Sequence, residues 1–288
     1  MKILIIGGTR YFGKYTVEKL LEEGHDVTIA TRGKTPDGFG DRVKRLVLDR
    51  QDPVSVKKAV GDMYFDVLID KVAYGSNDIP PVLDNVRCGR YVQMSTTSVY
   101  EKKHMDTREE EYDPSSYGIV WCWRNDYEYG ETKRQAEAVI VQKYPDIPSV
   151  MVRYPFVIGM DDYSKRMVFY VSHILEGKPM HVDNPDEQMG FIRSDEAGYF
   201  IAHMALSHFT GPVNGSASGT ISLNELFDYI EKKTGKKAIL SEDGDEAPYN
   251  GETEYSINTE KAEGTGFRFT RLHDWVYGLI DGILEELK

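Results

Sequence analysis

The chain has 288 residues, and 40% of them are hydrophobic, which is enough for one large domain or for a domain with a smaller lobe. Its formal net charge of -12 makes a nucleic acid an unfavourable partner, because such binding depends on Lys and Arg at phosphates. The two cysteines, Cys88 and Cys122, follow no spacing pattern, which is typical of a reducing compartment, so we expect a cytoplasmic protein. The apolar run at residues 3–6 is too short for a signal-peptide core or a membrane span, so we expect no membrane association.

Short β-branched runs alternate with amphipathic stretches along the first half of the chain, a pattern that predicts parallel strands joined by crossover helices. The expected strands are residues 3–6, 26–30, 43–48, 65–69, 90–95 and 149–153. A helix at residues 15–23, ended by Gly24, joins the first two strands. These elements predict an α/β fold with a doubly wound, parallel sheet of Rossmann type.

The elements become shorter after about residue 155, where good helices are expected only at residues 223–234 and 272–286. We therefore divide the chain into a Rossmann core, residues 1–155, and a mixed segment, residues 156–288. The mixed segment is expected to hold a smaller C-terminal substrate lobe and the last elements of the sheet. Two charged stretches, residues 101–114 and 241–254, are expected to be mobile loops.

A glycine turn, GGTRYFG, joins the first strand to the first helix. Small residues let a backbone approach a pyrophosphate, and the start of a helix offers it free N–H groups and a positive dipole end. The strand before the turn and the helix after it, within one βαβ unit, are the context that such a motif requires. We therefore predict a bound nicotinamide dinucleotide, NAD(P), held in the Rossmann core by Gly7, Gly8, Thr9, Arg10, Tyr11, Phe12 and Gly13.

Two arginines favour NADP over NAD as the cofactor. An arginine beside the adenosine ribose pairs with a 2'-phosphate, whereas an acid at the end of the second strand would bind the 2'-hydroxyl of NAD. The second strand ends in Arg32 and has no acid, and Arg10 replaces a glycine of the usual motif; the alternative is that both arginines are solvated surface residues. Asp49, after the third strand, either bonds the adenine amino group or caps the helix that starts near Pro53.

A second group of polar residues follows the strand at residues 90–95, in the segment STTSVY, and includes Thr96. Tyr129 and Lys133 lie four residues apart, on one face of a helix whose other face can pack on the sheet. A Lys ammonium and a positive nicotinamide ring together favour the phenolate, and lowering a tyrosine pKa from about 10 to about 7 takes on the order of 4 kcal/mol. The tyrosine would then exchange a proton with a substrate oxygen while hydride moves at the same carbon.

The same spacing recurs at Tyr229 and Lys233 on a helix near the C-terminus. No strand end with hydroxyl residues precedes that pair, so we interpret it as an ordinary helix pair.

These segments together resemble an extended, atypical short-chain dehydrogenase/reductase of the NAD-dependent epimerase/dehydratase family, and the resemblance spans most of the chain. It includes RYPFVIG, at residues 153–159, as the strand that leads into the substrate lobe. The resemblance implies that Thr96, Tyr129 and Lys133 form the catalytic triad, with Tyr129 as general acid/base, Lys133 on the nicotinamide ribose and Thr96 polarising the substrate oxygen. It also implies cofactor contacts at Ala73 and Pro155.

Departures from the family pattern narrow the expected reaction. Family dehydratases carry an Asp-Glu pair where this chain has Thr97 and Ser98, which disfavours dehydration. Phe156 replaces an asparagine that often contacts the diphosphate of a nucleotide sugar, so nucleotide-sugar specificity is in doubt.

Other departures leave two interpretations open. Trp121, Cys122 and Trp123, in a long gap before Tyr129, either wall the substrate pocket or attach a loop to the core. Asp70 and Lys71, in IDKVAY, are either peculiar to this branch or altered cofactor contacts. The charged run at residues 161–166 either contacts substrate or is solvated.

The leading hypothesis is an NAD(P)-dependent epimerase or reductase acting at a hydroxyl or carbonyl carbon of a sugar, nucleotide sugar or related small molecule. NADP favours the reductase, because an epimerase keeps its cofactor. The alternatives are a non-catalytic dinucleotide-binding regulator or RNA-associated member of the family, and a structural subunit. The histidines and cysteines form no metal-binding pattern, so no metal is expected, and helices of this fold commonly pair into a homodimer.

Overall fold

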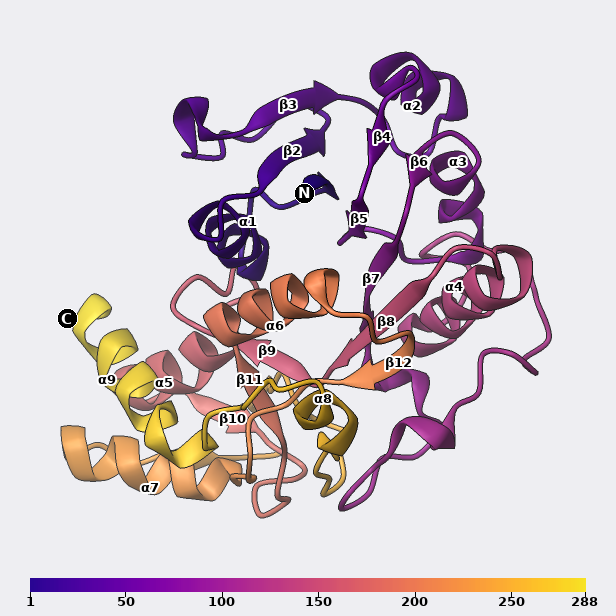
Figure 1. Ribbon diagram of the computed structural model, residues 1–288. Coiled ribbons are helices and arrows are strands. Elements are labelled where there is room, and N and C mark those ends of the chain that lie inside the picture. The colour runs from indigo at the N-terminus through magenta and orange to yellow at the C-terminus, as the bar shows by residue number, and fades with distance from the viewer.

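The computed structural model describes residues 1–288 and contains a seven-stranded parallel sheet in the order β12-β8-β7-β5-β1-β2-β3 (Figure 1). Two short sheets, β9–β11 and β13-β10-β14, lie in the second half of the chain, and β4 pairs with β6. The strands are β1 (Lys2–Ile6), β2 (Asp26–Thr31), β3 (Lys44–Val47), β4 (Tyr64–Phe65), β5 (Val67–Asp70), β6 (Arg87–Cys88), β7 (Tyr91–Thr96), β8 (Ser149–Tyr154), β9 (Phe156–Ile158), β10 (Pro179–His181), β11 (Phe191–Arg193), β12 (Gly211–Asn214), β13 (Ile239–Leu240) and β14 (Asp245–Glu246). The order of the large sheet reverses at β1, as in a Rossmann fold, and the predicted α/β class is confirmed.

Helices cover both faces of the large sheet, which explains why its central strands are apolar without alternation. The helices are α1 (Phe12–Glu22), α2 (Pro53–Val60), α3 (Pro80–Leu83), α4 (Tyr129–Lys143), α5 (Arg166–Glu176), α6 (Ser194–Leu206), α7 (Leu223–Thr234), α8 (Glu260–Gly264) and α9 (Val276–Glu286). One face packs under α1 and α6, and the other under α2, α3 and α4 (Figure 1). Residues 3 to 6 of β1 are buried between these two layers.

A second hydrophobic core lies in the lobe formed by α5, α7 and α9, seen at the lower left of Figure 1. All 25 buried residues of this core come from residue 158 onward, so the lobe is stabilised by its own interior. The segment after residue 155 also contributes α6 and β12 to the large sheet. The two sequence halves are therefore interleaved in space.

Several element boundaries differ from the expectation. The first helix begins at Phe12, three residues before the expected start, and the strand expected at residues 65–69 is divided at Asp66 into β4 and β5. The helices α5 and α6 were not expected; α6 lacks a polar face because it lies between the sheet and other elements. The expected helix at residues 272–286 is a short 3₁₀ turn, Leu272–Asp274, followed by α9.

The prediction of mobile loops was wrong for both charged segments. Thr107 and Glu109, in residues 101–114, are buried, and so are Ala247 and Tyr249, in residues 241–254. Both segments pack because a minority of their side chains, including the charged Glu109, are buried, while most of the charged ones remain exposed. None of the helices combines the length and the hydrophobicity that crossing a bilayer requires.

Candidate active site

A cavity of about 930 Å³ follows the carboxyl ends of the central strands, where the strand order reverses at β1. The glycine turn after β1 lines it, together with the ends of β2, β3, β5, β7 and β8. This is the crevice in which open α/β sheets bind their ligands, and the volume is within the upper range of small-molecule sites.

The glycine turn has the backbone geometry of a tight strand-to-helix connection. Gly7 and Gly8 have φ of 95° and 89°, a region that favours glycine. Arg10, which replaces the usual glycine, is not among the residues with positive φ, so an arginine fits there without strain. Tyr11 instead carries a φ of 54°, and it is held by burial and by a hydrogen bond from its hydroxyl to the Val157 carbonyl.

Gly13 does not line the cavity but makes the turn possible, because a Cβ there would lie 2.9 Å from the Gly8 Cα and would collide with the Lys71 ammonium. The other predicted turn residues, from Gly7 to Phe12, all line the cavity.

Three cations surround the cavity end beyond β2. Arg10 donates a hydrogen bond to Thr35 Oγ1 at 3.0 Å, and Arg32 and Lys34 are exposed beside it; none of the three forms an ion pair with a carboxylate. Asp49 also lines this end and accepts a hydrogen bond from the Gln51 N–H at 3.1 Å. The helix cap that we considered for Asp49 is provided by Asp52, which accepts from the Val54 N–H at 2.9 Å.

The predicted catalytic residues meet at the opposite end of the cavity. Thr96 ends β7, and its hydroxyl accepts a hydrogen bond from the Ser98 N–H at 3.2 Å. Tyr129 is the first residue of α4, and its side chain lines the cavity. Gly130 lets α4 start there, since a Cβ at that position would collide with the Ser98 carbonyl. The structure thus brings Thr96 and Tyr129 to one wall.

Lys133 lies beneath this wall, fully buried, one helical turn after Tyr129. Its Nζ donates hydrogen bonds to the carbonyls of Ala73, at 2.7 Å, and Met94, at 2.9 Å. Ala73, predicted as a cofactor contact, therefore supports Lys133 through its backbone carbonyl. The side chains of Ala73 and Lys133 do not line the cavity. Pro155, predicted as a cofactor contact, does line it.

The chain's own residues do not produce the phenolate that we expected. Burial raises the pKa of Tyr129, the neighbouring Tyr74 raises it further, and Thr96 and Arg124 oppose the shift only in part. Lys133 does little to lower the pKa of Tyr129, because its Nζ is directed at two carbonyls and lies 6.0 Å from the centre of the Tyr129 ring. Burial also lowers the pKa of Lys133 to about 8. The surroundings that the chain itself provides therefore favour the protonated phenol.

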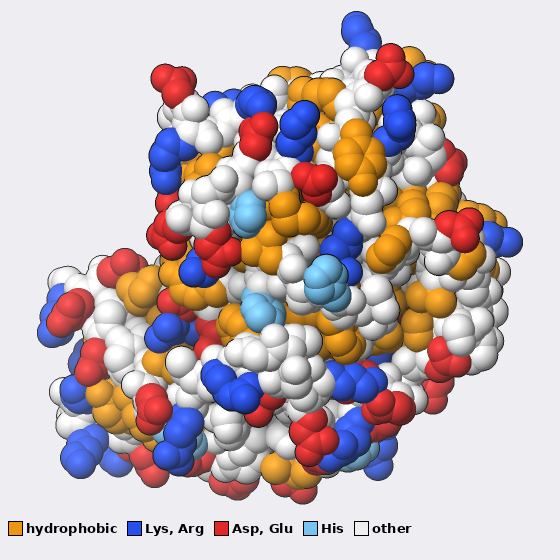
Figure 2. All heavy atoms as spheres, viewed as in Figure 1, with side chains coloured by type: hydrophobic (Ala, Val, Ile, Leu, Met, Phe, Trp, Pro, Cys, Tyr) orange, Lys and Arg blue, Asp and Glu red, His pale blue; other side chains and the backbone are white.

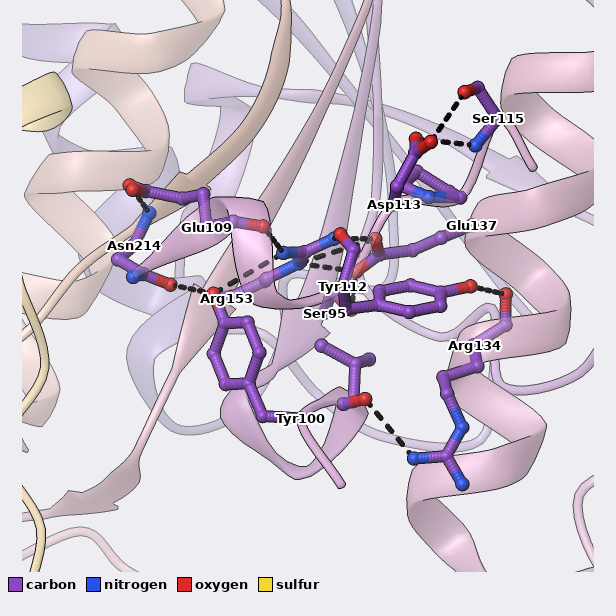
Figure 3. A network of polar contacts seen from close by, with 12 residues as sticks. Ser95, Tyr100, Glu109, Tyr112, Asp113, Ser115, Arg134, Glu137, Arg153 and Asn214 are labelled. Carbon is purple, nitrogen blue, oxygen red and sulfur yellow. Dashed lines mark hydrogen bonds and ion pairs between the residues drawn. The ribbon is translucent and has the colours of Figure 1, made fainter. Parts of the chain in front are cut away.

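A buried ionic network holds α4 against the sheet (Figure 3). Arg153, from β8, donates to Glu137 Oε2 at 2.6 Å, and Glu137 also accepts from the Ser95 hydroxyl, next to Thr96. Burial alone would lower the pKa of Arg153, but the charge of Glu137 and its hydrogen bonds raise it above the ordinary arginine value. Because Glu137 is one turn beyond Lys133, the network fixes the helix that carries Tyr129 and Lys133.

The same guanidinium also anchors the segment that we expected to be mobile, since it donates to the carbonyls of Glu109, at 2.9 Å, and Tyr112, at 3.2 Å (Figure 3).

The departures from the family pattern have visible structural consequences. Ser98 and the buried Thr97 bring hydroxyls, not carboxylates, to the cavity. Phe156 lines the cavity between two cations, with Lys103 Nζ 5.6 Å and the Arg166 guanidinium 5.3 Å from its ring centre. A ring in this position offers no amide to a diphosphate.

The segment with two tryptophans attaches a loop and does not wall the cavity. Cys122 is buried, and its N–H donates to Ser76 Oγ at 2.7 Å, while Trp121 and Trp123 are half exposed and do not line the cavity. Of the charged run at residues 161–166, only Tyr163 and Arg166 line the cavity.

Sequence reasoning missed Tyr74 and Arg124, which line the cavity beside Tyr129. The Tyr74 ring lies between the Arg124 guanidinium, at 4.2 Å, and the Lys133 ammonium, at 4.8 Å. The only sequence feature that could have indicated these two residues is their position along the chain. Tyr74 follows a strand end, and Arg124 precedes α4. No group of His, Cys, Asp and Glu side chains is arranged to hold a metal ion.

Comparisons with known proteins bear on the half of the cavity that surrounds the glycine turn. Residues 3–80 match the model of the NAD dependent epimerase/dehydratase family, a segment that includes the turn, Arg32, Asp49 and Lys71. The match covers this N-terminal segment and not the rest of the chain. The predicted resemblance to the NAD dependent epimerase/dehydratase family is thereby confirmed over these residues.

Among curated proteins, the chain is similar to the chloroplast stem-loop binding protein of 41 kDa b from Arabidopsis thaliana, with 26% identity over 65% of this chain. The match spans half the length of the plant protein, 50%.

Among solved structures, the fold is similar to UDP-glucose 4-epimerase from Thermotoga maritima, with a TM-score of 0.77, 15% identity and full coverage (100%) of both chains. It is also similar to UDP-glucuronic acid 4-epimerase from Bacillus cereus in complex with NAD, with a TM-score of 0.72, 19% identity and 100% coverage of both chains.

Proposed function

We propose that the protein is an NAD(P)-dependent oxidoreductase that moves hydride at a hydroxyl or carbonyl carbon of a sugar, nucleotide sugar or related small molecule. The observation that carries this proposal is a single cavity, with the dinucleotide-type glycine turn at one end and Thr96 and Tyr129 at the other. A cofactor lying along the cavity supplies the hydride donor or acceptor. The protein supplies a proton donor and a hydroxyl to hold the substrate oxygen.

The residues present fit such a cofactor. Gly13 keeps the turn free of a Cβ at its closest approach, and Arg10, Arg32 and Lys34 provide three cations without carboxylate partners at the adenosine end. Unpaired cations in a chain of net charge -12 are best explained by an anionic ligand, and we propose NADP in preference to NAD.

The state of Tyr129 favours reduction as the direction of catalysis. A phenol with a raised pKa holds its proton at neutral pH and can donate it to a carbonyl oxygen that receives hydride. Thr96 would hold that oxygen. Lys133, predicted to bind the nicotinamide ribose, is fully buried and does not line the cavity, so we propose that it supports the wall beneath Tyr129 through the Ala73 and Met94 carbonyls.

The substrate class follows from the other side chains at this end. The related folds are named as UDP-sugar epimerases, which brings nucleotide sugars into consideration. Phe156 in place of an amide and hydroxyls at Thr97 and Ser98 lead us to propose a carbonyl compound related to sugars, reduced without loss of water.

Identification of the dinucleotide released by the denatured protein tests the cofactor and the reaction type together. Loosely bound NADP would support a reductase, tightly held NAD would support an epimerase, and failure of both to bind in titration would remove the proposal.

The 2'-phosphate contact is tested by the double variant R10A/R32A. We expect it to bind NADP at least tenfold more weakly, because two charge-assisted contacts are lost, and to bind NAD as the wild type does. Equal losses for both dinucleotides would contradict the assignment of these arginines. The matched control is K14M, which removes an exposed cation from α1 outside the cavity.

A second candidate is a dinucleotide-binding protein that associates with RNA, because the plant relative is named as a stem-loop binding protein. The net charge of -12 opposes it, and acidic and basic side chains are interspersed on the face in Figure 2, with no continuous basic area. Binding of an RNA stem-loop at physiological salt by the wild type, with no turnover, would favour this candidate.

We further propose a cytoplasmic location, because Cys88 and Cys122 are both free thiols, and a homodimer, which light scattering of the purified protein can test. The division at residue 155 into a core and a mixed segment also remains our proposal.

A further inference from the structure

Lys71 follows β5 and extends into the turn between β1 and α1. Its side chain is 7% exposed and lines the cavity. The ammonium lies 3.9 Å from the centre of the Phe12 ring, at the position that a Cβ on Gly13 would need. Phe12 and Gly13 are the first two residues of α1, so a buried cation lies at the positive end of a helix dipole.

No protein group compensates this charge. Lys71 forms neither an ion pair nor a hydrogen bond through its ammonium. The adjacent carboxylate, Asp70, is engaged by Arg50 at 2.6 Å, and Arg50 also pairs with Asp78 at 2.9 Å. Asp161 is the one carboxylate whose charge acts on Lys71, and its effect is smaller than that of burial.

A buried, unpaired cation beside a helix N-terminus is destabilising unless an anion joins it. The site has the features of a phosphate cradle. The first N–H group of α1, at Phe12, has no protein acceptor, Gly13 keeps the backbone close, and the Lys71 ammonium lies within the same few ångströms. An uncharged side chain of the same length would fill this space with a smaller loss of folding stability.

We propose that Lys71 is a phosphate-binding residue, which supplies the positive charge for the cofactor's pyrophosphate, since Arg10 of the turn is directed to Thr35 at the adenosine end. This inference rests on the proposed function, since it places the pyrophosphate of a dinucleotide at the turn. The positive charge that binds the pyrophosphate would thus lie at the end of β5, apart from Arg10 and Arg32, which lie at the adenosine end.

The proposal has a consequence for pH. Burial lowers the pKa of Lys71 to about 7, so the free protein loses this charge as the pH rises through 7, and a bound anion raises the pKa again. Dinucleotide affinity should therefore be highest below pH 7 and fall by up to about tenfold per pH unit above it, with proton uptake on binding. Asp161 is the charged group that acts on Lys71, whereas Arg50 and Asp70 pair with each other at 2.6 Å. Lys133 contributes its own change only near pH 8.

Isothermal titration of NADP into the wild type, K71M and K14M at pH 6.5 and 8.5 tests the proposal. We expect K71M to bind about 10- to 100-fold more weakly at pH 6.5 and to lose most of the pH dependence. K14M removes a cation from the same helical turn but from its exposed side, and it should match the wild type. The wild type alone should take up protons at pH 8.5, measured in two buffers of different ionisation enthalpy.

Wild-type affinity in K71M at both pH values would overturn the proposal, and so would an equal loss in K14M. A melting temperature of K71M at or above that of the wild type shows that the variant is folded. Inorganic pyrophosphate separates this inference from the proposed function. If pyrophosphate binds the wild type but not K71M while no dinucleotide binds, only the proposed function fails; if neither ligand binds the wild type, both fail.

Discussion

The chain contains the spacing YxxxK twice on helices, and the two pairs have opposite environments. Tyr129 and Lys133 on α4 share no acidic partner, and Lys133 is fully buried against two carbonyls. Tyr229 and Lys233 on α7 both donate to Asp281 of α9, at 2.9 Å and 3.0 Å. Both members of the second pair donate to one carboxylate, which joins two helices of the lobe. In the first pair, Lys133 is engaged by carbonyls, and Tyr129 lines the cavity, where a ligand can reach it.

The difference shows that a helical spacing acquires its chemistry from the element at which the helix begins. Tyr129 starts its helix against the hydroxyl-bearing end of β7, where the cavity opens. Tyr229 lies in the middle of its helix, at the packing interface of α7 with α9. The interpretation of Tyr229 and Lys233 as an ordinary helix pair agrees with these contacts.

The largest expected effect is a difference in kcat between the variants Y129F and Y229F. Y129F should lower kcat by about 10²- to 10⁴-fold, because the proton donor is lost, while the dissociation constant of the cofactor stays within twofold. Y229F should leave kcat unchanged. Steady-state kinetics with the substrate identified by screening, together with cofactor titration, measure both. Comparable kcat losses in the two variants would remove the distinction.

The two lysines should respond to pH with opposite signs. The folded-state pKa of Lys133, about 8, is below the unfolded value near 10.5, so the unfolded chain binds more protons in this window. The free energy of unfolding of the wild type should therefore rise relative to K133M between pH 8 and 10, by on the order of 3 kcal/mol at most.

Lys233 should show the reverse. Hydrogen bonds from Lys233 to Tyr229 and Asp281 raise its pKa, so its contribution is present below pH 10.5 and is lost only above that. Urea unfolding of the wild type, K133M and K233M at pH 7, 8, 9 and 10 measures these slopes. A K133M curve parallel to that of the wild type would mean that the Lys133 pKa is unperturbed.

The smallest expected effect is on stability within the lobe. Y229F removes the hydrogen bond to Asp281 and should lower the free energy of unfolding by about 1 kcal/mol. Y129F, whose hydroxyl faces the cavity, should cost less than half of that. Chemical denaturation with both variants checks the order, and a larger loss in Y129F would assign Tyr129 a structural role.

Local sequence signals were sufficient where a residue's partners are close along the chain. The turn after β1 and the helix at Leu223–Thr234, with its Ser222 cap, could be predicted because strand, glycines and cap follow one another directly. The helix α6 could not, since its apolar surface reflects burial by distant elements. Two further features could not be predicted from the sequence: the hydrogen bond from Lys133 to the Ala73 carbonyl, and the absence of an ion-pair partner for Lys71. Both depend on which residues from separate strands lie next to one another.

Gly198 marks the place where α6 meets α1. A Cβ there would collide with the Phe12 carbonyl, so the helix that begins at the glycine turn lies directly against a helix some 180 residues later in the chain. During synthesis, the half of the chain that contains the glycine turn emerges first but cannot cover that face of its sheet until α6 has left the ribosome. Nascent chains that stop at residue 155 should therefore stay susceptible to protease, and the binding site should form late, as one of the last events of biosynthesis.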